Sequence, residues 1–286
     1  MHIIGFLGKV PVGDKVRVMG VINVSPESFY KKSVKVSTKE VSKTASAMEE
    51  HEADFIDIGA MSTAPYLKTM ISADEEIDRI KRAVKAVNES CGLPISVDTP
   101  RAKTADVALN LGADIVNDVT GLKHDVRMAR VVADHDASVI VCAYEKHAVS
   151  GNAIKTTINA LRKSVKLAKD SGIKSNKIII DPAIGFFRKK GSHPFFTRMK
   201  GMSWFDRDLI LINRIQDLHS LRKPVCVSVS RKSFIGKILN LENPEDRLIG
   251  SITAEAVCVL NGAHIVRTHN VYETMQAVKI AEAVLR

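Results

Sequence analysis

Polar and charged residues recur along this chain at or shortly after the ends of short apolar runs. They comprise two carboxylates, two amides, a hydroxyl, two cations and an imidazole: Asp98, Asp181, Asn23, Asn117, Thr63, Lys232, Arg267 and His269. Carboxylates and amides can orient a polar heterocycle through hydrogen bonds, and cations can hold an anionic group. If the fold gathers these side chains, the pattern predicts a binding site for a small polar molecule.

Each of these residues also has a simpler explanation when it is taken alone. Thr99 and Asn270, which stand beside two of them, are typical helix caps, and an isolated Asp often stabilises a loop. A lone Lys232 would more often be solvated than functional. The functional interpretation therefore depends on their shared placement at strand ends.

The apolar runs predict eight strands with helices between most of them. The expected strands are 16–24, 55–58, 94–97, 115–119, 138–142, 177–180, 224–229 and 263–266. Helical periodicity separates several of these runs, as at Ile77, Ile80, Val84 and Val87. Eight β/α units in 286 residues predict a single-domain (β/α)8 TIM barrel over residues 1–286, because such barrels need about 250 residues. Active sites of these barrels lie at the carboxyl ends of the strands.

Local signals predict where individual helices begin. Capping boxes are predicted by Ser37 with Glu40, Ser72 with Glu75 and Asn270 with Glu273. Thr99-Pro100 and Asn243-Pro244 each predict a helix start with proline at the first helical position. Residues 1–15 precede the first strand and are expected to form a hairpin at the amino-terminal end of the barrel.

Composition limits the class of protein. Hydrophobic residues make up 45% and charged residues 26%, which is typical of a globular protein rather than a disordered one. The four cysteines form no C-x-x-C pair, so we expect neither a disulfide scaffold nor a sequence-local zinc site. With no signal peptide and no membrane span recognisable, a cytoplasmic location is expected. The net charge of +10 is compatible with an anionic substrate, nucleic acid, a membrane surface or a solvated basic surface.

Seven motifs in the expected order resemble those of dihydropteroate synthases, members of the pterin-binding enzyme superfamily. They are residues 18–29 (VMGVINVSPESF), 57–65 (DIGAMSTAP), 95–99 (ISVDT), 115–119 (IVNDV), 181–186 (DPAIGF), 230–236 (SRKSFIG) and 266–271 (VRTHNV). The resemblance covers residues 16–286. Within the superfamily, Ser-Arg-Lys-Ser and Arg-x-His favour the synthase branch.

The resemblance implies the condensation of 6-hydroxymethyl-7,8-dihydropterin diphosphate with an aromatic amine, with release of diphosphate. It implies pterin contacts for Asp98, Asn117, Asp181 and Lys232, a diphosphate–metal region at Asn23, Arg267 and His269, and a substrate contact for Thr63. By the same resemblance, Asp98, Asp181, Lys232, Arg267 and His269 are the catalytic residues, and Mg²⁺ is the cofactor, with Asn23 as its protein ligand. A homodimer acting on small-molecule substrates in folate-type cofactor biosynthesis is expected, without a membrane or nucleic-acid partner.

Four departures concern the loops more than the pterin pocket. Ala64 replaces the usual Arg, residues 30–33 replace an Asp-Gly-Gly turn, and Phe187 and Ser228 stand where glycines are usual. The loss of the Arg leaves two candidates for the amine: 4-aminobenzoate, or a ribosyl-phosphate derivative as in methanopterin-type pathways.

Residues 187–207 form an enlarged basic loop in which aromatic residues are interleaved. It contains Arg188, Lys189, Lys190, Arg198, Lys200 and Arg207, with Phe187, Phe195, Phe196 and Trp204. Such a segment can be an ordered lid or solvated loop, can bind an anionic extension of the amine, or can bind single-stranded nucleic acid. For the whole chain, the alternatives to a synthase are a pterin-dependent methyltransferase and a catalytically silent pterin-binding protein.

Overall fold

Eight parallel strands lie side by side in the computed structural model, which describes residues 4–26, 30, 34–65 and 69–285. Their spatial order is β12 (Cys226–Val227), β13 (Ile265–Thr268), β3 (Arg17–Asn23), β4 (Phe55–Gly59), β5 (Ile95–Asp98), β6 (Ile115–Asp118), β7 (Ser138–Cys142) and β9 (Ile178–Asp181). A parallel bridge between Ile180 and Val225 brings the two ends of this sheet together. The predicted (β/α)8 barrel is confirmed.

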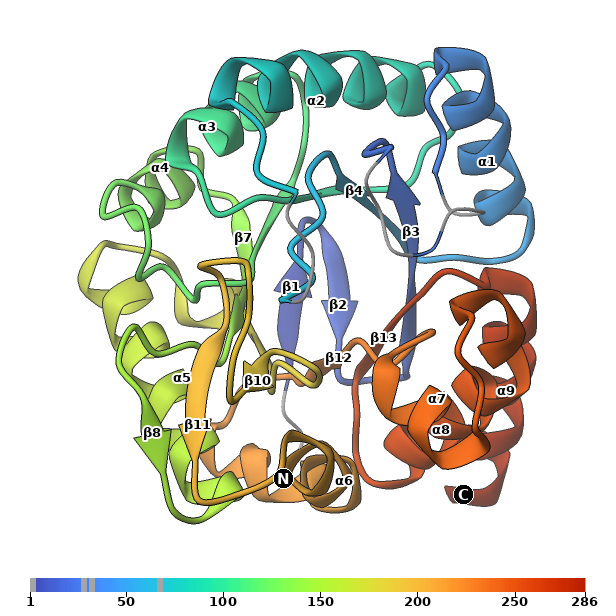
Figure 1. Ribbon diagram of the computed structural model, residues 1–286. Coiled ribbons are helices and arrows are strands. Elements are labelled where there is room, and N and C mark those ends of the chain that lie inside the picture. The colour runs from blue at the N-terminus through green and yellow to red at the C-terminus, as the bar shows by residue number, and fades with distance from the viewer. Residues whose placement is uncertain (1–3, 27–29, 31–33, 66–68, 286) are drawn as a thin grey trace.

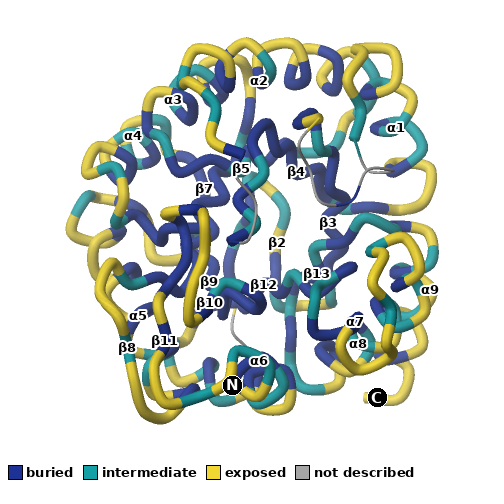
Figure 2. The backbone as a smooth tube through the Cα atoms, in the orientation of Figure 1, coloured by how far each residue is buried: buried dark blue, intermediate teal, exposed yellow. Residues whose placement is uncertain are grey.

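Helices surround these strands, as Figure 1 shows. The described α-helices are α1 (Thr38–Glu50), α2 (Ala73–Asn88), α3 (Ala102–Asn110), α4 (Met128–Asp134), α5 (Ala153–Asp170), α6 (Trp204–Asn213), α7 (Ser233–Leu239), α8 (Leu248–Leu260) and α9 (Val271–Leu285). The described 3₁₀ turns cover Ser175–Lys177, Ile215–Leu221 and Pro244–Arg247. Figure 2 shows buried strands at the centre and exposed positions on the outer sides of the helices.

Helix α2 illustrates why these segments are helical. Its apolar residues Ile77, Ile80, Val84 and Val87 recur with helical spacing, and all four are buried. Its first turn carries Asp74, Glu75 and Glu76, which interact favourably with the positive end of the helix dipole. The predicted periodicity is therefore the face that packs onto the barrel.

An antiparallel hairpin of β1 (Gly5–Leu7) and β2 (Val10–Val12) accounts for the described part of residues 1–15. Leu7 and Val12 are fully buried in one cluster with Met19, Phe55 and other side chains from the amino-terminal halves of the strands. The hairpin thus fills the end of the barrel opposite the polar strand ends.

The cap predictions succeed in part. Ser37 and Glu40 form the predicted reciprocal box. Ser72 caps α2, but the Glu75 carboxylate binds Arg79 at 2.7 Å instead of the cap backbone. Asn243 and Pro244 open a 3₁₀ turn rather than an α-helix.

Two predicted caps succeed only in part because tertiary contacts also use their side chains. The hydroxyl of Thr99 accepts the backbone N–H of Arg101 at 3.2 Å, but it donates to the buried Glu76 carboxylate at 2.6 Å, and α3 begins only at Ala102. Asn270 directly precedes α9, as predicted, but its amide oxygen accepts from the Arg231 guanidinium at 2.7 Å.

A small parallel sheet carries the enlarged segment. Strands β10 (Phe187–Arg188) and β11 (Thr197–Lys200) pair with each other, and β11 also pairs with β8 (Val149–Ser150). Across the described parts of the chain, no helix is both long enough and apolar enough to cross a membrane.

Candidate functional site

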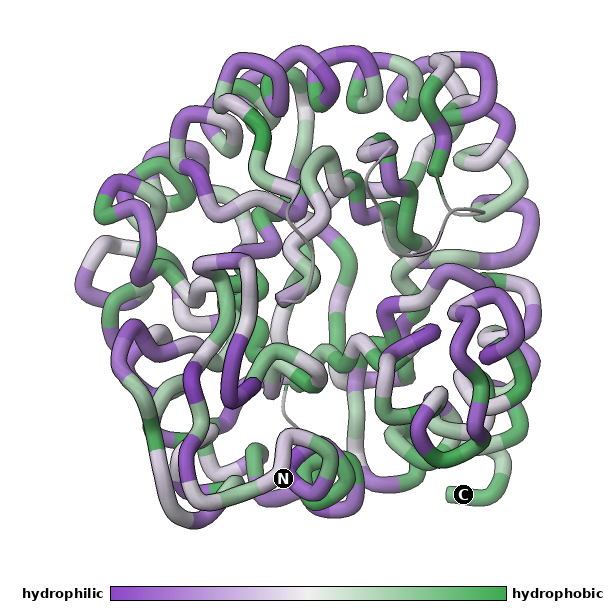
Figure 3. Tube along the Cα trace, in the orientation of Figure 1, coloured by the Kyte–Doolittle hydropathy of each residue, from purple (hydrophilic) through white to green (hydrophobic). Residues whose placement is uncertain are grey.

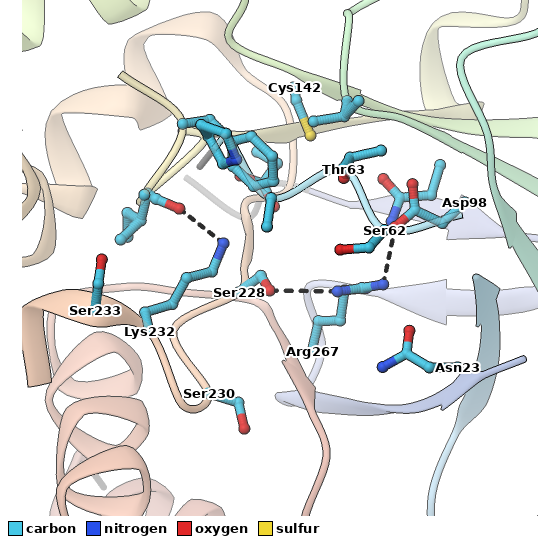
Figure 4. A pocket seen from close by; sticks show the side chains of 18 of the residues that line it. Asn23, Ser62, Thr63, Asp98, Cys142, Ser228, Ser230, Lys232, Ser233 and Arg267 are labelled. Atoms are coloured by element: carbon cyan, nitrogen blue, oxygen red, sulfur yellow. Dashed lines mark hydrogen bonds and ion pairs between the residues drawn. The ribbon is translucent and has the colours of Figure 1, made fainter. Parts of the chain in front are cut away.

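One pocket at the carboxyl ends of the strands is lined by all eight residues singled out from the sequence. They lie on β3 (Asn23), β5 (Asp98), β6 (Asn117), β9 (Asp181) and β13 (Arg267), and in the loops that hold Thr63, Lys232 and His269. Figure 4 shows Lys232, Arg267, Asp98 and Asn23 around this pocket. Parts of the first signature, residues 27–29 and 31–33, lie outside the described residues.

Arg267 connects two carboxylates in the floor of the pocket. Its Nε donates to Oδ2 of Asp57 at 2.6 Å, and a terminal nitrogen donates to Oδ2 of Asp98 at 3.0 Å. Asn117 donates to the same Asp57 oxygen at 3.2 Å. Burial alone would lower the pKa of Arg267, but the two carboxylates raise it above its usual value. Arg267 is therefore a permanent cation held in one orientation.

Asp98 is poised between its two protonation states. Burial raises the pKa of Asp98 to about 7, with Asp57 acting in the same direction and the Arg267 cation opposing it. The carboxyl can thus accept or donate a hydrogen bond near neutral pH.

Asp181 at the end of β9 and Lys232 just before α7 both line the pocket. Oδ1 of Asp181 accepts the Ala183 backbone N–H at 2.6 Å, and burial raises the pKa of Asp181. Lys232 Nζ donates to the Ile184 carbonyl at 2.9 Å and lies 4.3 Å from the centre of the Phe186 ring. Burial lowers the pKa of Lys232 to about 8, although Asp181 opposes this shift.

Glycine at position 185 is required by the path of the Lys232 side chain. Gly185 has a φ of +88°, which side chains with a Cβ rarely adopt. A Cβ atom there would also lie 3.0 Å from Cδ of Lys232. This glycine therefore lets the ammonium group reach the pocket.

His269 follows β13, and its ring contacts Ser230 in the loop after the neighbouring strand β12. Its Nδ1 is 3.0 Å from the Ser230 hydroxyl, and its ring meets the edge of Tyr30 with centroids 5.2 Å apart. Burial, together with the cations Arg267, Arg231 and Lys232, lowers the pKa of His269 to about 3. The imidazole is consequently neutral at physiological pH.

The loop containing Thr63 and Ala64 forms one wall of the pocket. Arg79 donates to the Ala60 carbonyl at 3.1 Å, and Thr69 donates to the Ser62 carbonyl at 2.6 Å. Ser192 of the enlarged segment donates its backbone N–H to the Pro65 carbonyl at 2.7 Å. The loop is thus braced both by α2 and by the segment above it.

The two arginines at the ends of the enlarged segment point inward. Arg207 is fully buried, pairs with Asp208 at 3.2 Å, and lies over the Phe187 ring at 3.8 Å. Arg188 lines the pocket and stacks on Trp204 at 4.0 Å. These contacts make Arg188 and Arg207 part of the support for the loop that follows Asp181.

The remaining charges of the segment stay in solvent. Lys189, Lys190, Arg198 and Lys200 are exposed, whereas Phe187, Phe195 and Phe196 are buried. Three of the four aromatic rings are therefore buried, and the fourth, Trp204, is half-buried beneath Arg188.

Several pocket residues were not among those singled out from the sequence. They are Phe186, Arg188, Ser228 and Ser230. Asp57, which was also missed, is fully buried behind the lining and binds Arg267. Asp57 lies two residues before Gly59, which pairs with Asp98, so the alternation of strand residues places Asp57 on the same face of the sheet as Asp98. Asp118, the residue after Asn117, points to the opposite face of its strand, because successive strand residues face opposite sides. Its carboxylate accepts three hydrogen bonds of 2.7 Å from Thr120 and Leu122.

The donor set fits a metal ion only in combination with a substrate. Among residues 4–26, 30, 34–65 and 69–285, no group of three or more His, Cys, Asp or Glu could hold an ion. Asn23 offers one amide oxygen at the rim of the pocket. Mg²⁺ often takes one or two protein ligands, phosphate oxygens and water, so Asn23 suits an ion that arrives with a phosphorylated substrate.

The sequence matches known proteins over most of its length. A family model described as "Pterin binding enzyme" matches residues 19–269. Dihydropteroate synthase of Clostridium beijerinckii is 31% identical over 280 residues, covering 96% of each chain.

Solved structures agree with these matches. A dihydropteroate synthase from Clostridium difficile in the presence of pteroic acid is 32% identical with a TM-score of 0.83, covering 96% of this chain and 98% of that one. The Xanthomonas albilineans enzyme with 4-aminobenzoic acid is 25% identical with a TM-score of 0.85, covering 100% and 99%.

Proposed function

This chain belongs to the pterin-binding enzyme family, and from that premise we infer that it is a dihydropteroate synthase-type transferase. It condenses 6-hydroxymethyl-7,8-dihydropterin diphosphate with an aromatic amine and releases diphosphate, in folate biosynthesis. The observation that carries this inference is one pocket in which carboxylate and amide groups adjoin a cationic end. The relatives are synthases, so the methyltransferase and the silent pterin-binding protein are not favoured.

The carboxylate end of the pocket suits the pterin ring. A pterin presents an amino group and a ring N–H as adjacent donors, and the two oxygens of Asp181 can accept both. Asn117 can donate and accept along the ring edge, and its side chain is held by Asp57. Lys232 contributes a cation near the ring carbonyl, and Asp98 adds a second carboxyl group.

The cationic end suits the diphosphate. Arg267 supplies a fixed positive charge, His269 a neutral imidazole, and Asn23 an amide oxygen. When Mg²⁺ is bound, Asn23 would hold it, and the ion would neutralise charge on the diphosphate oxygens.

The chemical step replaces a C–O bond by a C–N bond. The amine lone pair forms the new bond to the methylene carbon, while the C–O electron pair leaves with the diphosphate. The amine nitrogen then loses one proton to solvent. Since the leaving group is already an anion, catalysis consists mainly of positioning and of stabilising the negative charge that develops near Arg267.

We propose 4-aminobenzoate as the amine, because a similar enzyme is known in complex with that acid. Its aromatic ring would lie near Phe186 and the Thr63 loop, which line the outer part of the pocket. A ribosyl-phosphate amine is the competing substrate, since Ala64 provides no loop cation for a carboxylate.

We also propose that the protein is a homodimer in the cytoplasm. Large apolar side chains are exposed on α8 and α9, which pack against each other: Ile249, Val257, Leu260, Tyr272, Ile280, Val284 and Leu285. Figure 3 shows hydrophobic stretches along these helices. A second copy of the chain would remove this apolar surface from water. Sedimentation of wild type and of Ile280→Lys tests it: a dimer that the substitution dissociates supports the proposal, and a wild-type monomer contradicts it.

The function is tested by measuring diphosphate release with pterin diphosphate and a panel of aromatic amines, with and without Mg²⁺. Turnover of 4-aminobenzoate is expected, with no turnover of aniline derivatives that carry no acid group. Exclusive turnover of the ribosyl-phosphate amine would replace the proposed substrate. Absence of release with every amine, in a protein that binds the pterin, would contradict the synthase function itself.

A further inference from the structure

The enlarged segment carries four exposed cations that the proposed reaction does not use. We call them the rim cations: Lys189, Lys190, Arg198 and Lys200. They lie on or between β10 and β11, which form a small sheet with β8 on one side of the barrel (Figure 1). Within the described part of the chain, none of the four forms an ion pair with a carboxylate. Their charge is therefore available to a ligand.

Two contacts place the segment at the mouth of the pocket. Arg188 lines the pocket and directly precedes Lys189 and Lys190. After one further residue, the backbone N–H of Ser192 donates to the carbonyl of Pro65, another lining residue, at 2.7 Å. The first two rim cations are thus held between two points of the pocket lining.

Strand pairing brings the other two rim cations to the same place. Arg198 is the register partner of Arg188, and neighbouring strands lie about 4.8 Å apart. Alternate residues of β11 face opposite sides of its sheet, so Arg198 and Lys200 are exposed on one face, while the other two residues of the strand are buried. Strand spacing and chain length therefore put the Cα atoms of all four rim cations within about 10 Å of the Arg188 Cα.

The chain around the rim cations contains no compensating carboxylates. Residues 182–205 include no Asp or Glu, and neither do residues 146–169, which contain β8, the other strand that pairs with β11. Glu145, just before the second range, is already paired with Lys163 at 2.9 Å. The rim of the pocket therefore carries a local excess of positive charge.

This charge suits a small anion better than nucleic acid. Single-stranded nucleic acid is usually held by exposed aromatic rings as well as by cations. Phe187, Phe195 and Phe196, the rings that the sequence interleaves with these cations, are buried. A small anion needs no such ring, because charges at a pocket mouth attract it over about one Debye length, about 8 Å at physiological salt.

We propose that the rim cations draw the pterin diphosphate towards the pocket and so speed its association. The identity of this ligand rests on the proposed function. The negative charge of the substrate lies on its diphosphate, whereas the pterin ring is uncharged near neutral pH, so the attraction acts on the diphosphate. Charges at the rim of a site change the association rate and its salt dependence, and they leave the contacts that hold the bound ligand in place.

Association can be measured by stopped-flow fluorescence with the pterin diphosphate alone, without turnover. In one variant all four rim cations are replaced: Lys189→Gln, Lys190→Gln, Arg198→Gln and Lys200→Gln. Its association rate constant should be about tenfold below that of wild type, with a nearly unchanged dissociation rate constant. Association of the hydroxymethyl-dihydropterin without diphosphate should be the same in both proteins. An unchanged rate constant for the diphosphate, or an equal fall for both ligands, would overturn the proposal.

A control variant removes the same net charge from the opposite end of the barrel. Four exposed cations lie in or beside the hairpin or near the amino-terminal ends of the strands, and the control replaces them: Lys9→Gln, Lys15→Gln, Lys169→Gln and Arg222→Gln. This variant should associate with the pterin diphosphate at nearly the wild-type rate. Equal reductions in the two variants would show that only the net charge matters, which contradicts a role for the rim.

Salt gives an independent measurement. The Debye length falls from about 30 Å at 0.01 M to about 8 Å at 0.15 M ionic strength, so the wild-type association rate constant should fall several-fold over this range. The rim variant should lose less, because fewer charges attract the ligand. The same salt dependence in both proteins would contradict the proposal.

Turnover separates this inference from the proposed function. If association responds as expected but no amine is converted, the proposed function fails and the role of the rim cations stands. If an amine is converted while wild type and the rim variant associate equally fast, the role of the rim cations fails and the proposed function stands. Absence of any binding of the pterin diphosphate would overturn both.

Discussion

The Asp57 carboxylate holds the Arg267 guanidinium at 2.6 Å, across 210 residues of sequence. Asp57 is fully buried on β4, and Arg267 lies at the end of β13, one strand beyond β3. Because Asp57 also accepts from Asn117, a single carboxylate orients one group for each half of the proposed substrate. Asp57 therefore orients side chains at both ends of the pocket.

Asp57→Asn should reduce kcat/KM for the pterin diphosphate by at least about tenfold, because a hydrogen bond to a charged group contributes about 1.5–3 kcal/mol. The pKa of Asp98 should also fall below its value of about 7, since Asp57 contributes to raising it. Diphosphate release measured across pH reports both effects. Asp134→Asn, at an exposed surface pair, is the charge-matched control. Unchanged kinetics and pH profile in Asp57→Asn would contradict this role.

Asp181→Ala should abolish pterin binding while leaving the fold intact. The carboxylate is proposed to accept two pterin donors, whereas its one described protein hydrogen bond comes from the backbone N–H of Ala183, two residues further on. Pterin binding by calorimetry and circular dichroism of the variant provide the two readouts. Wild-type pterin affinity in this variant would show that the site is wrongly assigned.

Asp118→Ala, in contrast to Asp181→Ala, should affect stability rather than pterin binding. Asp118 is fully buried and accepts three bonds from its own loop, so its loss should lower the free energy of unfolding by several kcal/mol. Urea unfolding measures this change. Pterin affinity per folded molecule should stay within a few-fold of wild type.

Lys232 should make pterin binding and stability respond to pH in opposite directions. Its pKa is about 8 in the folded protein and about 10.4 in an unfolded chain, so its cation is lost first from the folded state. Pterin affinity should therefore fall as pH rises through about 8. Between about 8 and 10.4 the unfolded chain binds more protons, so the contribution of Lys232 to stability rises with pH.

Lys232→Arg separates this effect from other titrations, because a guanidinium stays charged over the whole range. Pterin affinity measured by titration at each pH should no longer decline near pH 8 in this variant. An identical decline in both proteins would assign it to another group.

Ala183→Gly should change the free energy of unfolding by less than about 1 kcal/mol. Ala183 has a φ of +56°, a left-handed conformation that costs a residue with a Cβ about 1–2 kcal/mol. Glycine avoids this cost but loses about 0.5–1 kcal/mol of chain entropy and about 0.8 kcal/mol from the methyl group, because Ala183 is buried in the core. The urea midpoint should therefore move little, with pterin affinity retained. Gly185→Ala is the converse control. It should lower both the urea midpoint and the pterin affinity, because its Cβ would contact the Lys232 side chain.

The barrel and most of the residues of the candidate site could be predicted from the residue pattern alone. Eight β-branched runs with helical periods between them sufficed for the fold, because each run must be buried between the barrel interior and the surrounding helices. Parallel strands present their carboxyl ends on one side, so the ends of the runs predicted which residues would meet.

Residues of the same type take different roles because of contacts that form only in the folded chain. Asp57 and Asp118 both stand near strand ends, yet strand register turns Asp57 towards Arg267 and Asp118 towards its own loop. Thr99 and Asn270 look like caps locally, but Glu76 and Arg231 offer charged partners that are distant in sequence. Arg207 looks like a surface charge, and its burial follows from Asp208 and two backbone carbonyls that only the folded loop brings to it. Partners of this kind depend on distances between strands, which no local pattern contains.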